Sequence, residues 1–198
     1  MSEALRVESV RLWFRDHEAL FQTYPGCPIE TLRWRNKSGS STYCVHYMLH
    51  KKHGTLTVYG GLYEAVYQWY CGDGETNWKF IADCNIDYFA GKCMASEKGR
   101  GYPDWDRRAA MAQLEDQIKE CELPKLDDED MKEAAEAAES KDGWLAYVNR
   151  KIEDGDWQAD DYEWACDAGR VVDLVCLAHL EGVKMAVAQR DAQLKEKT

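Results

Sequence analysis

The sequence predicts an α+β protein with a short N-terminal helix, an antiparallel meander sheet of three to five strands and an α-helical C-terminal half. Three observations predict this class. Apolar residues within the first 22 positions recur at helical spacing. Positions 29–82 carry short runs of β-branched and aromatic residues between turns. Beyond Pro103 the composition becomes rich in Ala and Glu, which favours helices.

The first helix is expected over residues 7–22, because apolar side chains repeat there with a period near 3.6. The segment 24–28 ends it, since its two prolines cannot continue a helix and Gly26 permits a turn.

The sheet is expected over residues 29–82. Strands are predicted at 31–35, 42–49 and 55–59, separated by turns at 38–41 and 50–54. Residues 65–71 read as a further strand or a helical turn, and 78–82 as another short strand.

The helical part is expected to begin at Ile86 and to continue through four more helices. Asp104 is a candidate N-cap for a helix ending near Cys121, and Asp142 for one ending near Ile152. Between them, acidic residues open a helix at 127–140. A single long helix is predicted from about 159 to about 195. We therefore divide the chain into a mixed α+β part, 1–103, and an acidic helical part, 104–198, and expect them to pack as one compact unit.

Charge is distributed unevenly between these two parts. Residues 1–103 contain 12 Lys/Arg and 11 Asp/Glu, a net charge of +1, whereas residues 104–198 contain 13 and 25, a net charge of −12. A negative surface repels phosphate, which disfavours direct binding of nucleic acid. It attracts a basic protein surface, and we expect a host protein or protein–nucleic-acid complex with such a surface as the partner.

Location is predicted from what the sequence lacks. The N-terminus has no basic-then-apolar leader, and no run approaches the roughly 18 apolar residues of a membrane span. We expect a cytoplasmic protein. The eight cysteines are irregularly spaced without a C-x-x-C pair, which favours reduced thiols.

No motif for catalysis or for a cofactor is found. The glycine patterns of phosphate-binding loops are missing. Cys44, His46, His50 and His53 lie close together, but their spacing matches no zinc module, and a strand with histidines facing solvent explains them better. We therefore expect no cofactor, no metal and no catalytic residue.

The predicted contact surface consists of acidic residues with interleaved tryptophans in the C-terminal part. Carboxylates can take the place of phosphates before a nucleic-acid-binding protein, and tryptophans can anchor such a contact. The predicted residues are Asp127, Asp128, Glu129, Asp130, Asp156, Trp157, Asp160, Asp161, Glu163 and Trp164. The competing hypothesis places the contact on the sheet, at Arg33, Trp34, Arg35, Lys51 and Lys52.

Residues 84–96 (CNIDYFAGKCMAS), with GRGY at 99–102 and Trp105-Asp106, resemble a group of uncharacterised phage and prophage accessory proteins. Residues 56–66 are similar in character, so the resemblance covers about residues 55–106, a quarter of the chain. It implies an anti-defence role of the anti-CRISPR or anti-restriction type, in which the protein inhibits a host defence complex. Two alternatives remain open. One is an enzyme acting on a small molecule or nucleotide, and the other is a structural or regulatory phage protein.

Overall fold

The computed structural model describes residues 3–72, 74–97, 103–120, 123–158 and 160–196, apart from the side chains of residues 3, 103, 104, 161 and 162. The chain forms two compact units. Unit 1 comprises Met1–Tyr102 together with Val172–Thr198, and unit 2 comprises Pro103–Val171. The expected second part, 104–198, is thus divided between the units, because its last helix packs on the sheet of unit 1.

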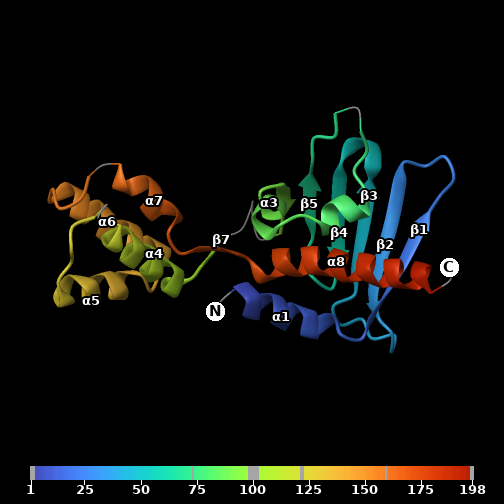
Figure 1. Cartoon of the computed structure of the whole chain (residues 1–198), viewed down its shortest axis with the longest axis horizontal. Coiled ribbons are helices and arrows are strands. Elements are labelled where there is room, and N and C mark those ends of the chain that lie inside the picture. Colours follow the sequence, from blue (N-terminus) through green and yellow to red (C-terminus); the bar gives the residue numbers. More distant parts are fainter. Residues whose placement is uncertain (1–2, 73, 98–102, 121–122, 159, 197–198) are drawn as a thin grey trace. The chain divides into compact units, whose positions relative to one another are not determined.

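Unit 1 is built on a six-stranded antiparallel meander in which the strands follow one another in chain order (Figure 1). Its strands are β1 (His17–Thr23), β2 (Ile29–Asn36), β3 (Val45–His50), β4 (Thr55–Gly60), β5 (Ala65–Gln68) and β6 (Cys93–Ser96). Its helices are α1 (Glu3–Phe14), the 3-10 turn η1 (Lys51–His53), α2 (Trp78–Ala82), α3 (Ile86–Ala90) and α8 (Leu174–Lys195). The predicted α+β class and the antiparallel meander are confirmed.

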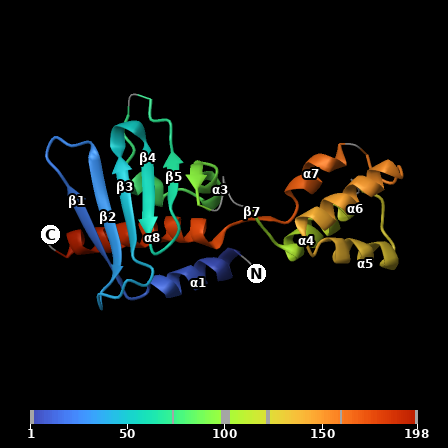
Figure 2. The ribbon, with the colours of Figure 1, turned by 180° about the vertical axis from the view of Figure 1, so that it is seen from behind.

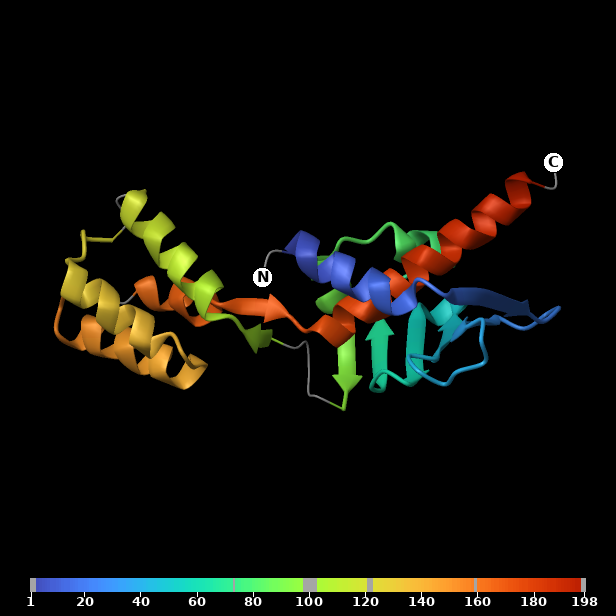
Figure 3. The ribbon, with the colours of Figure 1, turned by 90° about the horizontal axis from the view of Figure 1, so that it is seen from below.

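One face of this sheet is covered and the other is open. Helices α1 and α8 lie together on one side of the strands (Figure 3). Seen from behind, β1 to β4 lie in front of α8, and no described helix of unit 1 lies over them (Figure 2). Alternation along β3 matches this arrangement, because Val45, Tyr47 and Leu49 are buried while Met48 is 39% exposed. The core of unit 1 therefore lies between the sheet and α8.

Two strands occupy segments that the sequence predicts as helical. The helix expected at 7–22 ends at Phe14, and β1 pairs with β2 from His17 to Thr23. The buried His17 ring lies 5.1 Å from Phe14 and 5.6 Å from Trp34, measured between ring centroids. Near residue 93, α3 gives way to β6, which extends the sheet at its edge. Pairing across the sheet outweighs local periodicity in both segments.

One short segment differs from its prediction, and a second forms the strand that was one of two predicted alternatives. The strand predicted at 78–82 is α2, because the Asn77 side chain accepts a hydrogen bond from the Phe80 amide and caps a helix. The ambiguous segment 65–71 contains β5.

Unit 2 is mainly helical. Its helices are α4 (Arg107–Lys119), α5 (Asp128–Ala137), α6 (Lys141–Glu153) and α7 (Asp161–Asp167), and a small sheet pairs β7 (Pro103–Trp105) with β8 (Arg170–Val172). Its core is centred on Trp144, whose indole N–H donates to the Ala165 carbonyl at 2.9 Å. The N-caps are Asp106 and Ser140 rather than the expected Asp104 and Asp142.

The long helix expected at 159–195 is interrupted. Gly169 adopts φ +77°, a left-handed conformation that ends α7 and leads into β8. Helix α8 then starts at Leu174, with the Asp173 side chain as its cap. Within the described residues, no helix is long and apolar enough to cross a lipid bilayer.

Candidate functional site

The first predicted contact group, Asp127–Asp130, forms the N-terminal end of α5. The Asp127 carboxylate accepts hydrogen bonds from the amides of Glu129 and Asp130, both at 2.9 Å. The acids of the first turn also complement the positive end of the helix dipole. Asp128 and Glu129 remain exposed to solvent. This group therefore stabilises α5 as well as presenting negative charge.

Two predicted contact residues bind the buried ammonium group of a lysine within unit 2. Lys151 is 8% exposed, and its Nζ lies 2.8 Å from Asp130 Oδ1 and 3.1 Å from Asp156 Oδ2. These hydrogen bonds raise the pKa of Lys151 above its ordinary value, so the ammonium stays charged. The charges of Asp130 and Asp156 are thus partly neutralised within unit 2.

The two tryptophans among the predicted contact residues, Trp157 and Trp164, pack toward the core of unit 2. Trp157 is 4% exposed, and its ring lies 5.7 Å from Tyr147 and 5.9 Å from Trp164. Trp164 is half-buried, and its ring centroid lies 6.4 Å from that of Trp144. The prediction of an exposed aromatic anchor is corrected for Trp157, which belongs to the core because an indole of this size stabilises a small helical unit by burial.

Four predicted acids remain exposed and have no neutralising partner among the described residues. Asp128, Glu129, Asp160 and Glu163 form no ion pair with any residue that the structure describes. The Asp161 side chain lies outside the described part. Unit 2 as a whole contains 21 Asp/Glu and 9 Lys/Arg, a net charge of −12, whereas unit 1 contains 15 and 16, a net charge of +1. The entire charge excess of the chain therefore lies in unit 2.

Not all residues of the competing site on the sheet are available for contact with a partner. Trp34 is 1% exposed and belongs to the core. Lys51 binds Glu30 at 3.1 Å at one end of the sheet. Arg33 and Arg35 lie on β2, at positions that alternate with the buried Leu32 and Trp34, and therefore face the open side.

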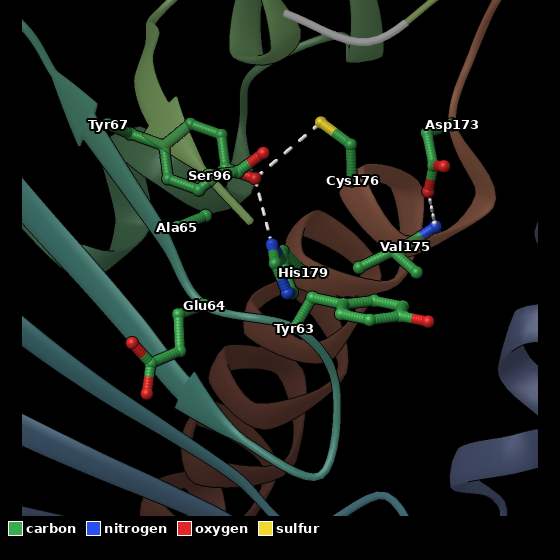
Figure 4. Close-up of a pocket in the computed structure, with 9 residues that line it drawn as sticks. All are labelled: Tyr63, Glu64, Ala65, Tyr67, Ser96, Asp173, Val175, Cys176 and His179. Carbon is green, nitrogen blue, oxygen red and sulfur yellow. Dashed lines mark hydrogen bonds between the residues drawn. The ribbon is translucent and has the colours of Figure 1, made fainter. Parts of the chain in front are cut away.

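A polar cluster lies between α8 and the sheet in unit 1 (Figure 4). The Tyr67 hydroxyl lies 2.8 Å from His179 Nδ1 and donates to Cys176 Sγ at 3.6 Å. The three side chains are buried around a cavity of about 10 Å³, which holds at most one water molecule. A substrate has no room in this cavity.

The electrostatics of this cluster also disfavour catalysis. Burial lowers the pKa of His179 to about 4 and raises the pKa of Cys176 to about 12. Near pH 7 both groups are neutral, so Cys176 is not an activated nucleophile. The Tyr67 hydroxyl, His179 and Cys176 instead join β5 to α8 through buried hydrogen bonds.

The cysteine and histidines considered for metal form two separate pairs. Cys44 Sγ lies 3.6 Å from His46 Nε2, and the rings of His50 and His53 are 4.2 Å apart. His46 and His50 are four positions apart on β3, which places them about 13 Å apart along the strand. Among the described residues, no group of three or more His, Cys, Asp or Glu side chains is placed to hold a metal ion.

The buried ion pair of Lys151 was not predicted, although the sequence contains a signal for it. Trp144, Tyr147 and Val148 form the buried stripe of α6, and Lys151 is the next position on that stripe. A lysine in a core position indicates a buried ion pair. The nearby acids are therefore its expected partners.

Comparison of the chain with models of protein families, with curated proteins and with solved structures finds no match. The fold and the charge distribution define an α+β protein that carries a strongly acidic helical unit as an insertion between β6 and α8.

Proposed function

We propose that this chain is a non-enzymatic binding protein whose acidic helical unit contacts a basic surface of a partner protein. The observation that carries the proposal is the confinement of the net charge of −12 to residues 103–171, while the rest of the chain is close to neutral. A uniform acidic surface would serve solubility alone. Charge concentrated in one compact unit also steers that unit toward a positive partner.

The proposed partner is a complex that normally holds nucleic acid. Such a complex presents arginines and lysines where phosphates bind, and exposed carboxylates can occupy the same positions. Asp128, Glu129, Asp160 and Glu163 supply carboxylates that no described base neutralises. The resemblance of residues 55–106 to phage accessory proteins supports the narrower proposal that the partner is a host defence complex and that binding inhibits it.

Charge of this kind acts mainly on the rate of association. Long-range attraction between exposed charges is screened over about 10 Å at 0.1 M salt, so the association rate should fall as salt rises. Dissociation depends on short-range contacts and should change much less.

The test compares two variants with the same net charge. In the first, Asp128→Asn, Glu129→Gln, Asp160→Asn and Glu163→Gln remove four charges from unit 2. In the matched control, Glu8→Gln, Asp83→Asn, Asp87→Asn and Glu196→Gln remove four exposed charges from unit 1. The wild type and both variants are used to capture proteins from host lysate, which are quantified by mass spectrometry.

The captured partner is then purified for kinetics at two salt concentrations. We expect the unit 2 variant to associate about tenfold more slowly at low salt and the control to associate like the wild type. Equal association by both variants would refute the assignment of the contact to unit 2. Plating of phage on a defended host that expresses the chain tests the narrower proposal, which predicts restored plaque formation.

A further inference from the structure

A polar depression lies at one end of the open sheet face in unit 1. It has a volume of about 490 Å³, which is within the usual range for small-molecule sites. Its polar lining comes from β2, the loop that follows it and the start of β3, and consists of Arg33, Arg35, Ser40, Ser41, Cys44 and His46. Among the residues that the structure describes, no acidic side chain lines it.

The charge of this depression comes mainly from Arg33. Arg35 already binds Glu18, with Nε 3.0 Å from the carboxylate oxygen Oε1. The Arg33 guanidinium is exposed and forms no hydrogen bond or ion pair within the described part of the chain. Arg33 pairs with His46 across the β2–β3 ladder, which brings both side chains to the same face.

His46, which lines the depression, is held in place by its neighbours. Its ring stacks on Tyr59, with centroids 4.9 Å apart and planes inclined by 13°. Its Nε2 lies 3.6 Å from Cys44 Sγ. Burial and the charge of Arg33 both lower the pKa of His46, so at neutral pH the imidazole is uncharged and can donate one hydrogen bond.

The backbone shapes this end of the sheet. Gly60 adopts φ +118°, and a Cβ atom there would lie 2.5 Å from the Cys44 carbonyl oxygen. Gly61 donates its amide hydrogen to that same carbonyl at 2.7 Å. The two glycines therefore let the chain pass close to Cys44 and leave space above it. Because the depression combines this space with an unpaired guanidinium, it suits an anion and repels metal cations.

We propose that this depression binds the oxyanion group of a small molecule, with Arg33 as the main cationic contact and His46 and the serine hydroxyls as further hydrogen-bond donors. A guanidinium binds carboxylate and phosphate through two parallel hydrogen bonds, so both are oxyanions of the expected class. All of these residues belong to unit 1, and the proposal is independent of partner binding by unit 2.

Cys44 provides a direct readout, because its thiol lines the depression while the exposed Cys27 lies elsewhere. The full-length protein is treated with iodoacetamide in sodium chloride, sodium phosphate or sodium acetate at matched ionic strength. The alkylation rates of Cys44 and Cys27 are measured in each sample by peptide mass spectrometry. A bound oxyanion at about twice its Kd should slow alkylation of Cys44 about threefold, since one third of the sites remain free. The rate for Cys27 should not change.

Two variants link this protection to Arg33. Arg33→Ala should raise the Kd of the anion about tenfold or more, because one charge-assisted contact is lost. Arg33→Lys keeps the charge and should give intermediate protection. Lys37→Ala is the matched control, because Lys37 is an exposed base beyond β2 that does not line the depression. Circular dichroism checks that each variant is folded.

The outcomes separate the possible ligands. Protection by phosphate alone identifies a phosphate group as the ligand, and protection by acetate identifies a carboxylate. The proposal is refuted if neither anion protects Cys44 beyond chloride, or if Arg33→Ala is protected as well as the Lys37→Ala control.

Discussion

Replacing Lys151 with alanine should destabilise unit 2, because it leaves two carboxylates without their shared partner. The Lys151 side chain is 10% exposed, and its Nζ binds both Asp130 and Asp156. The helix that carries Lys151 also packs Trp144 and Tyr147 into the core. Loss of the ammonium therefore affects the position where α5, α6 and the 154–157 turn meet.

The expected loss of stability follows from the solvent exposure of Lys151, Asp130 and Asp156. Removing one partner of a fully buried pair costs about 3–5 kcal/mol, and an exposed pair contributes about 0.2–1 kcal/mol. The Asp130 and Asp156 side chains are 33% and 52% exposed, so both can regain water when Lys151 is lost. We expect a loss of about 2 kcal/mol, which lowers the melting temperature of a unit of this size by about 10 °C.

The assay is thermal and urea unfolding followed by tryptophan fluorescence, since Trp157 lies beside Lys151 in the core of unit 2. Arg150→Ala is the matched control. Arg150 is the neighbouring residue on α6 and pairs with Glu133, but both side chains are more than 40% exposed. It should cost only about 0.5 kcal/mol. Equal effects of the two substitutions would refute the reasoning.

The pH dependence gives a second check on the same ion pair. The folded-state pKa of Lys151 is raised above its ordinary value of 10.5. Its contribution is therefore fully present below about pH 10.5 and is lost as the pH rises toward the folded-state pKa. The difference in unfolding free energy between wild type and Lys151→Ala should shrink above that pH.

Two further predictions concern one buried side chain and one strained turn. Burial lowers the pKa of His179 from 6.5 to about 4, so the unfolded chain binds a proton more readily, and stability should fall by about 3 kcal/mol as the pH drops through that interval. Urea unfolding at pH 7 and near pH 4 should show a smaller fall in His179→Gln than in wild type, and equal falls would contradict this. Gly169→Ala should cost about 3 kcal/mol, because its φ is +77° and its Cβ would lie 2.8 Å from the Trp105 ring. Gly155→Ala, at φ +81° with no atom within 4 Å, should cost only about 1 kcal/mol, and thermal unfolding of both variants measures the difference.

Much of the fold follows from local sequence patterns. Alternation predicts β2, β3 and β4 because each has one buried and one open face. Acidic first-turn residues predict α5, whose cap is Asp127. The segments that local pattern does not predict are those whose structure depends on distant partners. His17 starts a strand because β2 lies alongside it, and Cys93 lies in a strand because β5 offers a free edge.

The exposure of the candidate contact residues could be predicted only in part, for a related reason. Sequence shows which residues are acidic, but exposure is decided by packing. Trp157 is buried because Tyr147 and Trp164 surround it, and Asp156 is bound because Lys151 occupies a core position of α6. Local sequence pattern also does not predict the division into units, because α8 packs on strands that lie more than 100 residues earlier in the chain.

The ends of the inserted unit lie next to each other, which makes the insertion removable. Strand β7 pairs with β8, and the Asp106 amide donates to the Gly169 carbonyl at 2.8 Å. An insertion whose ends meet can be replaced by a short turn without stretching the chain on either side. The buried core residues of the two units are also distinct sets, so excision removes no buried side chain of the unit 1 core.

We therefore predict that unit 1 folds without residues 107–168. An Asn-Gly turn joins Asp106 directly to Gly169, because that dipeptide favours the tight turn of a hairpin. Trp105→Ser accompanies the deletion, since the Trp105 indole otherwise donates to the Ala138 carbonyl of the removed unit. The shortened protein should unfold cooperatively, show a circular dichroism spectrum with both helix and strand contributions and keep anion protection of Cys44, yet fail to capture the partner. Binding of the partner by the shortened protein would place the contact on unit 1. A shortened protein without cooperative unfolding would show instead that the sheet and α8 depend on the insertion for their stability.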